Sequence, residues 1–393
     1  MKKKLLFIIP NLNSGGAEKA LLSLLQTLDF ERYEVDLLLF KKEGIFLNQL
    51  PKEVHLLPEP QNYSYFDMPL LQAVTELITK LKFKVLFYRL AAIYIYKTER
   101  IPTVREQKVW SFMKNALHNL DKEYDVAIGY LQKTANYFCI DKVKATKKIG
   151  FVHNDYRMLK LDKTIDEPYF KKFDSIVTIS EVCESILKEE FPQFSDKISL
   201  MYNISSPKSI RKMAEEKVDL DSSIDTIVTV GRLNDQKGLD IAIDACKILV
   251  DNGHKLKWYI IGEGNLRPNL EQQIAENNLQ SNFILLGLKE NPYPYVQQAT
   301  IYAQPSRFEG KSIAIDEAKI LHKPILVTNF PSAKDQIEHL VNGYVVEINA
   351  KAIADGIAKL LTDKEVTNTL VLNLQKESLG TESEIEKMYQ LME

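Results

Sequence analysis

The sequence predicts an α/β protein built from two doubly wound parallel sheets. Short apolar runs rich in β-branched residues alternate with longer segments whose apolar positions recur every three or four residues. This alternation is typical of parallel sheets covered by helices on both faces. It begins again in the second half of the chain, and 393 residues exceed the roughly 100–200 residues of one ordinary domain.

Five apolar runs of the first half are expected to be strands. They are LLFIIP (5–10), EVDLLLF (34–40), DVAIGY (125–130), KKIGFVH (147–153) and SIVTIS (175–180). The first run follows MKKK as in a signal peptide, but it is shorter than the apolar region of such a peptide and no small-residue cleavage site follows. The next segment, AEKALLSLLQTL (17–28), has the periodicity of an amphipathic helix.

The second half repeats the pattern. The expected strands are TIVTVG (226–231), KWYIIG (257–262), NFILLG (282–287), IYAQP (301–305) and PILVT (324–328), and the expected helices cover 239–253, 265–278 and 311–322. Between the halves, residues 202–223 are polar and lose periodicity, which favours a domain boundary there. We therefore predict domains at 1–205 and 206–375, and a C-terminal helix (376–393) that could pack back on the first domain.

Composition excludes several classes of protein. Three cysteines without a CxxC pair argue against a disulfide framework or a zinc site and favour a reducing cytoplasm. Residues 1–205 carry 30 Lys and Arg against 26 Asp and Glu, and residues 206–393 carry 21 against 27. This mild basic excess, with no recognised binding motif, does not suit nucleic acid. No apolar run reaches the roughly 18 residues of a membrane-spanning helix, so any membrane contact would be peripheral.

Cationic and glycine-rich turns follow the first two strands of the second half. Arg232 and Lys237 lie in VGRLNDQKGLD (230–240), where a guanidinium fork and an ammonium group suit a diphosphate. The alternative is a solvated turn before a helix. In IIGEGNLRPNLEQ (260–272), Gly262 and Gly264 flank Glu263. That turn could cover a nucleotide base or ribose, or it could be a tight turn only.

Two acids eight residues apart follow the strand at 301–305. Glu309 precedes a glycine, and Glu317 lies inside an apolar, helix-like run. Because a buried carboxylate needs partners, we expect a ligand rich in hydroxyl groups to supply them. The N–H groups around Gly310–Ile313 are expected to be exposed and to add donors for a phosphate or a sugar oxygen.

The first half offers two weaker signals. Gly15 and Gly16 connect the first strand to the first helix, where close backbone approach and free N–H groups favour an anion. The spacing is not GxGxxG, so no nicotinamide cofactor is expected. His153 ends a strand, and it is either a cleft residue or a hydrogen-bonded structural histidine. No metal-ligand cluster accompanies it.

Taken together, these loops resemble the family-4 retaining glycosyltransferases of the GT-B fold. The resemblance covers most of the chain and rests on GGAE, VGRLNDQKG, IIGEG and the E-x7-E pair Glu309 and Glu317. SRFEGKSIAIDEAKIL (306–321) also resembles bacterial enzymes that build capsular and other surface polysaccharides. The fold implied is two Rossmann-like domains that face a shared cleft, and the reaction implied transfers a sugar from a nucleotide-diphosphate donor.

The resemblance also assigns roles at matching positions. It implies that Arg232 and Lys237 hold the donor diphosphate, that Glu309 and His153 contact the donor sugar, and that no metal or other cofactor is needed. It also implies that Glu317 contacts the ribose and that Gly15 and Gly16 line the acceptor and phosphate side. The other donor-binding residues that it implies are Gly310, Lys311, Ser312, Gly262, Glu263 and Gly264.

Two departures from the family's pattern leave the donor sugar open. Many members have Gly-Phe-Gly after the first glutamate, where this chain has Gly310-Lys311-Ser312, and YNISS (202–206) lacks the glycine that often follows its asparagine. A UDP-sugar is the expected donor, and a glycan or lipid-linked glycan the expected acceptor. The competing interpretations are an inactive homologue that acts as a partner subunit and a sugar-nucleotide epimerase of the same fold.

Residues 80–114 interrupt the strand–helix alternation. They carry nine Lys and Arg against two Glu, and they are rich in Phe, Tyr, Leu and Ile. This composition suits a helix lying in an anionic membrane surface, which would place a cytoplasmic enzyme on the inner face of the cell membrane. A helical pair packed on the first domain, with its lysines in water, is the alternative.

Overall fold

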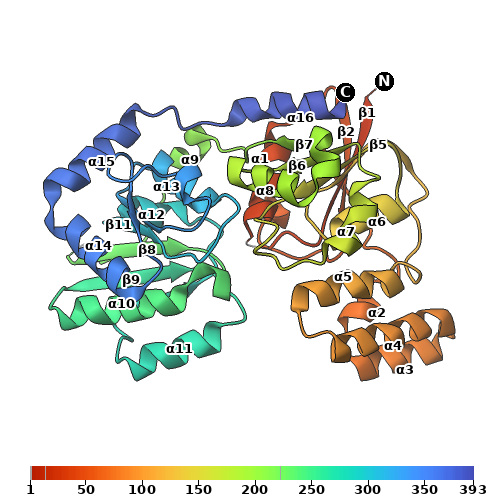
Figure 1. Ribbon diagram of the computed structural model, residues 1–393, viewed down its shortest axis with the longest axis horizontal. Coiled ribbons are helices and arrows are strands. Elements are labelled where there is room, and N and C mark those ends of the chain that lie inside the picture. Colours follow the sequence, from red (N-terminus) through yellow and green to blue (C-terminus); the bar gives the residue numbers. More distant parts are fainter. Residues whose placement is uncertain (1, 14, 222) are drawn as a thin grey trace. The chain divides into compact units, whose positions relative to one another are not determined.

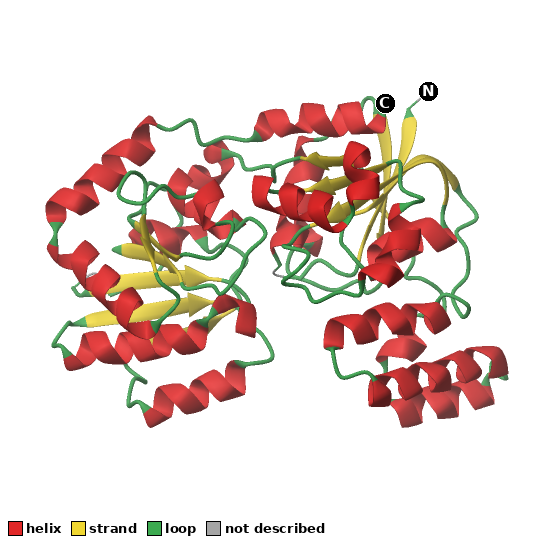
Figure 2. Cartoon of the chain, viewed as in Figure 1, coloured by secondary structure: helices red, strands yellow, loops and turns green. Residues whose placement is uncertain are grey.

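The computed structural model describes residues 2–13, 15–221 and 223–393, and the chain divides into two compact units. The first comprises Met1–Asn13, Leu24–Tyr202 and Ile385–Glu393, and the second comprises Ser14–Ser23 and Asn203–Glu384. Helix α1 (Gly16–Thr27) thus contributes residues to both. Each unit has a parallel sheet at its centre with helices around it (Figure 1, Figure 2).

The sheet of the first unit has the order β3-β2-β1-β4-β5-β6-β7. Its strands are β1 (Lys3–Ile9), β2 (Tyr33–Leu39), β3 (Val54–Leu56), β4 (Glu123–Gly129), β5 (Lys144–Val152), β6 (Ser175–Thr178) and β7 (Ile198–Leu200), all paired in parallel. The interior strand β1 is fully buried from Leu5 to Ile9, because helices cover both faces of such a sheet.

The other helices of this unit are α2 (Ser64–Asp67), α3 (Leu70–Thr79), α4 (Phe83–Thr98), α5 (Pro102–Met113), α6 (Thr134–Lys142), α7 (Lys163–Phe170), α8 (Glu181–Glu190) and α16 (Ile385–Met392). Helices α2 to α5 form a helical group that α5 joins to the sheet layer (Figure 1). Trp110 of α5 is buried, and its indole donates a hydrogen bond to Asp141 of α6 at 2.9 Å. At the C-terminal end, Tyr389 of α16 stacks on Tyr33 with ring centroids 5.5 Å apart.

The sheet of the second unit has the order β10-β9-β8-β11-β12-β13. Its strands are β8 (Asp225–Val230), β9 (Leu256–Ile261), β10 (Phe283–Gly287), β11 (Ile301–Gln304), β12 (Ile325–Thr328) and β13 (Tyr344–Val346), again all parallel. The helices are α9 (Pro207–Met213), α10 (Leu239–Asp251), α11 (Arg267–Glu276), α12 (Tyr293–Gln298), α13 (Ile313–Ile320), α14 (Ala350–Thr362) and α15 (Lys364–Lys376). Apolar clusters on the two faces of the sheet form the core.

The predicted α/β class with two parallel sheets is confirmed, and each predicted strand and helix has a counterpart. Sequence reasoning missed the three-residue strands β3, β7 and β13 and helix α9 inside the polar segment 202–223, and it named no helix at α6, α7, α8, α12 or α14. In the segment predicted as a C-terminal helix, α15 ends at Lys376 and α16 begins only at Ile385. Within the described residues, no helix is both long and apolar enough to cross a bilayer.

Candidate functional site

Most of the predicted site residues of the second unit lie along one edge of its sheet. Strands β9, β8, β11 and β12 are neighbours and run parallel, so the loops at their carboxyl ends lie next to one another, where open α/β sheets bind ligands. These loops carry residues 262–264, 231–238, 305–312 and 329–336.

Glu309 is the centre of a buried polar network in these loops. Its carboxylate is 6% exposed and accepts hydrogen bonds from Ser306 Oγ at 2.6 Å, Gln304 Nε2 at 3.2 Å and Gln236 Nε2 at 3.2 Å. The ammonium of Lys237, on a short 3-10 turn after β8, completes the set at 2.6 Å. A buried charge with this many donors is compensated within the protein.

Glu317 has a different set of partners. It lies on the second turn of α13, as predicted, and is 4% exposed. One carboxylate oxygen accepts from Lys19 Nζ at 2.6 Å and from Tyr293 OH at 2.9 Å, and Lys19 Nζ lies 4.4 Å from the centroid of the Tyr293 ring. Burial is the main reason that the pKa of the Tyr302 hydroxyl lies well above its usual value, and the negative charges of Glu317 and Glu309 raise this pKa further.

These contacts correct one step of the sequence argument. The partners of the two buried carboxylates were expected to come from the hydroxyl groups of a ligand, whereas the chain itself supplies a lysine to each. Lys19 and Tyr293 were missed because they are distant in sequence from Glu317. The only local signal for Lys19 was its place in GGAEK, next to the predicted glycines.

The amides at the start of α13 require a second correction. Gly310, Ser312 and Ile313 are buried rather than exposed. The Ser312 N–H donates to Gln336 Oε1 at 2.8 Å, and Gln336 Nε2 donates to the Ser312 carbonyl at 2.8 Å and to Asp316 at 2.8 Å. Lys311 is half-buried between them.

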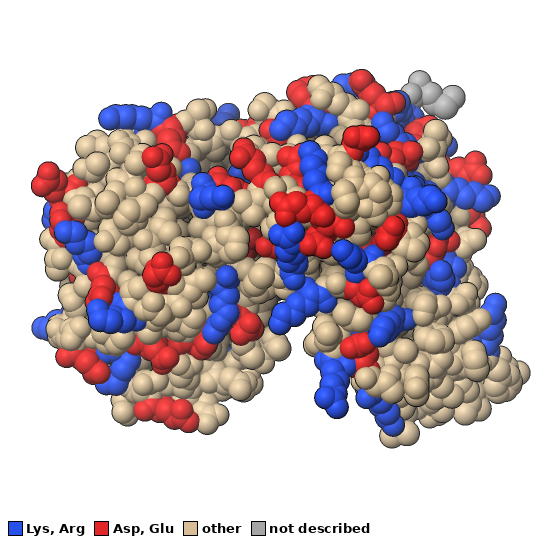
Figure 3. All heavy atoms as spheres, viewed as in Figure 1, with Lys and Arg blue, Asp and Glu red and all other residues tan. Residues whose placement is uncertain are grey.

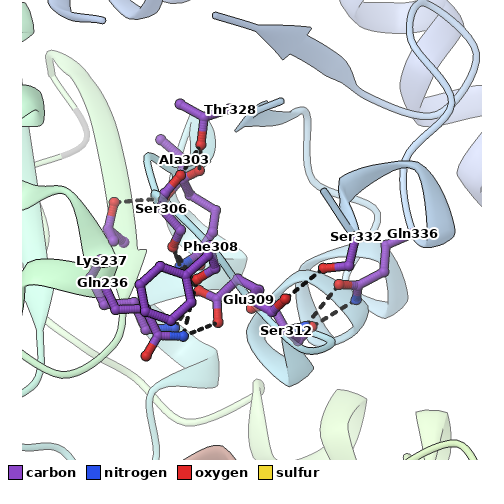
Figure 4. Close-up of polar contacts among 12 residues, drawn as sticks. Gln236, Lys237, Ala303, Ser306, Phe308, Glu309, Ser312, Thr328, Ser332 and Gln336 are labelled. Atoms are coloured by element: carbon purple, nitrogen blue, oxygen red, sulfur yellow. Dashed lines mark hydrogen bonds and ion pairs between the residues drawn. The ribbon is translucent and has the colours of Figure 1, made fainter. Parts of the chain in front are cut away.

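Three side chains hold the loop that carries Glu309: Thr328 at the end of β12, and Ser332 and Gln336 in the segment after it. Thr328 Oγ1 donates to the Ser306 carbonyl at 2.5 Å, and Ser332 Oγ donates to the Glu309 carbonyl at 2.8 Å. Gln336 holds Ser312 as described. Figure 4 shows Ser332 and Gln336 on one side of Glu309, with Gln236 and Lys237 on the other. Sequence reasoning missed this group, whose only signal is the spacing of four residues between its members.

Gln336 should therefore act as a positioning residue for Glu309 and the start of α13. If the chain catalyses the sugar transfer that the resemblance implies, Gln336→Leu should lower kcat by roughly 10- to 100-fold, because small misplacements of a site cost about that much, and the KM for the donor should change little. Steady-state kinetics would measure the split. Gln297→Leu, at an exposed position of the same unit, is the matched control, and an unchanged kcat for Gln336→Leu would contradict the assignment.

Glycines fix the shape of the turns beside this network. A Cβ added to Gly262 would lie 1.9 Å from the Gly231 carbonyl oxygen, so only glycine lets these two loops approach so closely. Between Gly262 and Gly264, Glu263 binds Arg267 through two hydrogen bonds of 2.8 and 2.7 Å. The structure thus places Glu263 in an ion pair at the start of α11.

The positive charge of Arg232 acts on Glu18 in the first turn of α1. Arg232 is exposed, while Glu18, in the first turn of α1, is 7% exposed. Burial raises the pKa of Glu18, and the charge of Arg232 opposes this effect. The Glu18 carboxylate lies against Gly15, and among the described residues its Oε2 has no hydrogen-bond partner. Helix α1 begins at Gly16, and its start was predicted to favour an anion. The acidic side chain of Glu18 already lies in this first turn.

His153 directly follows β5 in the first unit and is 6% exposed. Its ring stacks on Phe151 with centroids 5.5 Å apart and lies 4.9 Å from the ring centroid of Tyr130. Burial lowers the pKa of His153 to about 3, so the imidazole is neutral at pH 7. Its Nε2 is buried and has no hydrogen-bond partner within the described part of the chain.

Residues 211–377 match the family model described as glycosyl transferases group 1. The amylovoran biosynthesis glycosyltransferase AmsK of Erwinia amylovora is 34% identical over 143 residues, which are 34% of this chain and 35% of AmsK. The N-acetylgalactosamine-N,N'-diacetylbacillosaminyl-diphospho-undecaprenol 4-alpha-N-acetylgalactosaminyltransferase of Campylobacter jejuni is 28% identical over 223 residues, 56% of this chain and 60% of that enzyme. The chain thus matches less than two thirds of the length of either relative.

The fold similarity extends over the whole chain. The structure of Anabaena Alr3699/HepE in complex with UDP and glucose superposes with a TM-score of 0.68 at 17% identity and covers 99% of this chain and 98% of that one. At this identity the likeness shows the fold alone, which is the GT-B arrangement of two Rossmann-like domains. The segment 211–377 that matches the family model contains Arg232, Lys237, Glu309 and Glu317.

Proposed function

We propose that the protein is a retaining glycosyltransferase that moves a sugar from a nucleotide-diphosphate donor, a UDP-sugar in our expectation, to a glycan or lipid-linked glycan in bacterial surface polysaccharide synthesis. The observation that carries the proposal is the buried Lys237–Glu309 pair, 2.6 Å apart, at the carboxyl ends of β8 and β11 within the segment that matches the family. The names of the Erwinia and Campylobacter relatives support the polysaccharide and lipid-linked acceptors, and the HepE complex supports UDP.

In this proposal the two cations act on the leaving group. Arg232 and Lys237 bind the donor diphosphate, and the Lys237 ammonium, held by Glu309 in the absence of donor, stabilises the negative charge that develops on the departing phosphate oxygen. Glu309 then accepts hydrogen bonds from hydroxyl groups of the donor sugar. Glu317 contacts the ribose, with Lys19 and Tyr293 fixing its carboxylate.

The remaining predicted residues complete the donor and acceptor contacts. His153 offers its unpaired Nε2 to a sugar hydroxyl, since a neutral imidazole nitrogen accepts a hydrogen bond. The turns at 262–264 and 310–312 shape the donor site, and Gly15 and Gly16 line the acceptor and phosphate side.

The step we propose breaks the bond between the anomeric carbon and the diphosphate oxygen, whose electron pair stays with the diphosphate. The acceptor oxygen bonds to the same carbon from the face that the diphosphate leaves, so the configuration is retained, and the acceptor's proton passes to the departing phosphate oxygen. Positioning and charge stabilisation supply the catalysis. We propose that no metal is required.

The test is transfer itself. The purified protein is incubated with a panel of UDP-, GDP- and dTDP-sugars and with glycan or lipid-linked acceptors, and release of the nucleoside diphosphate is measured together with the mass of the product. Proton NMR of the new anomeric centre reports retention or inversion, and EDTA should leave the rate unchanged. Binding of UDP without transfer to any acceptor would favour the inactive homologue, and interconversion of nucleotide sugars without acceptor would favour the epimerase.

The sequence has three cysteines and no CxxC pair, which supports our proposal of a cytoplasmic protein. A peripheral position on the inner face of the membrane would bring the protein to lipid-linked acceptors.

A further inference from the structure

Helices α3 and α4 expose an unusual amount of apolar surface. Of the sixteen large apolar side chains that the described residues leave exposed, ten lie between Leu70 and Ile101. Single exposed apolar residues are normal, but contiguous apolar patches on a protein surface mark sites that bind partners or membranes. Because the exposed apolar side chains are concentrated in one helical hairpin, we expect a partner or a membrane to cover them.

On α4 the exposed residues form a continuous stripe. Phe83, Phe87, Leu90 and Tyr94 are 58%, 66%, 48% and 67% exposed, and their spacing of four, three and four residues places them on one side of a helix. Residues on the opposite side of α4, among them Val85 and Ala92, are buried in the core of the first unit. Helix α4 is therefore apolar on both sides, and only one of them is covered.

The turn between α3 and α4 adds a strained apolar residue. Leu81 has a φ of 54°, a left-handed conformation that is unfavourable for a residue with a Cβ. Its side chain is nevertheless 73% exposed, and Leu71 at the start of α3 is 83% exposed. We call Leu71, Leu81, Phe83, Phe87, Leu90 and Tyr94 the hairpin face.

The charges around the hairpin face are mainly positive. Lys84, Lys97 and Arg100 are exposed on or beside the two helices, while Glu76 and Glu99 are ion-paired with Lys80 and Lys108 at 2.8 and 2.6 Å. In Figure 3 the region of α3 and α4 is largely free of charged side chains, with Lys and Arg at its margin. Apolar residues bordered by cations are the composition of helices that lie in an anionic membrane surface.

We propose that the hairpin face inserts into the interfacial layer of an anionic lipid bilayer and that the bordering cations bind its headgroups. A second copy of the chain fits less well, because pairing two hairpin faces would bring the cations of both copies together. The surface differs from the predicted segment 80–114. It begins on α3, before residue 80, and it excludes α5, whose Val109, Trp110 and Met113 are buried. The lipid-linked acceptor rests on the proposed function, but membrane binding does not.

The experiment is cosedimentation with vesicles of phosphatidylcholine alone or mixed with phosphatidylglycerol, without any substrate. The wild-type protein should pellet with the anionic vesicles at low salt, and less of it should pellet at high salt. Phe87→Asp with Leu71→Asp should weaken binding at least about tenfold, since each change removes a large apolar group from the lipid contact. Lys84→Glu with Lys97→Glu should weaken binding mainly at low salt.

Leu372→Asp, at an exposed leucine of α15 that is 54% accessible, is the matched control and should bind like wild type. Thermal unfolding checks that the variants fold. Wild-type protein that stays in the supernatant with anionic vesicles at low salt would overturn the proposal, as would a solution dimer that Phe87→Asp dissociates. If the protein binds anionic vesicles but transfers no sugar in the separate transfer assay, this inference stands and the proposed function is refuted.

Discussion

Replacing Lys237 with alanine is expected to lower kcat/KM for glycosyl transfer by roughly 100-fold, the usual cost of removing one group that stabilises transition-state charge. The fold should lose much less than the activity. Three hydrogen-bond donors besides Lys237 remain on the Glu309 carboxylate in the variant, and they limit the cost of leaving this acid without its lysine. Steady-state kinetics with a soluble acceptor, together with thermal unfolding, would measure both effects.

A structural role for the Lys237–Glu309 pair must be separated from a catalytic one. The double variant Lys237→Ala with Glu309→Gln removes both charges, so no carboxylate is left buried without its cation. The double variant should recover stability under either role, but not activity, because Glu309→Gln alone is expected to abolish transfer. If Lys237 acts only by keeping the loops folded, the loss of activity in Lys237→Ala should follow its loss of stability. If Lys237 acts on the leaving group, Lys237→Ala should lose activity at temperatures where thermal unfolding shows that it is still folded. Retention of more than about half of the wild-type kcat/KM in Lys237→Ala would refute the catalytic role.

Neutralising the two buried acids is expected to have contrasting effects. Glu309→Gln should abolish or severely reduce transfer and leave the affinity for UDP nearly intact, because this carboxylate is proposed to contact the donor sugar. Glu317→Gln should mainly weaken UDP binding, because its carboxylate is proposed to contact the ribose. Each change also removes the charge partner of a lysine, Lys237 or Lys19, so thermal unfolding must accompany each measurement.

Calorimetric titration with UDP and turnover assays on the same preparations would test the contrast. Glu377→Gln is the matched control, since Glu377 pairs with Lys319 at 2.9 Å in the same unit and is not a predicted site residue. Equal losses of UDP affinity in Glu309→Gln and Glu317→Gln would show that the assignment of one acid to the sugar and the other to the ribose is wrong.

The elements that sequence could predict are those with enough residues to show a pattern. Strand β1 has five consecutive buried apolar residues, whereas β3, β7 and β13 have three residues each, too few to reveal an alternation. Similarly, the place of Glu309 on a loop and of Glu317 on the second turn of a helix follows from local signals around Ser312.

The partners of the site residues could not be predicted in the same way. Lys19 reaches Glu317 across 298 positions of sequence, and Gln336 reaches Ser312 from another loop. Such pairs depend on which strands are neighbours in the sheet, an order that hydrophobic periodicity does not reveal. The exposed residues of α3 were also missed, because the search for basic and apolar residues began at residue 80.

The hydrogen bonds from Thr328, Ser332 and Gln336 have a consequence for how this protein could evolve. They hold the loop from Ser306 to Ser312 by its backbone, and backbone groups are present whatever side chains the loop carries. Drift at a position such as Lys311, where this chain departs from the pattern of the glycosyltransferases that it resembles, therefore need not unfold the loop. Under the proposed function, a lineage could in this way explore new donor sugars while the architecture of the loop stays constant.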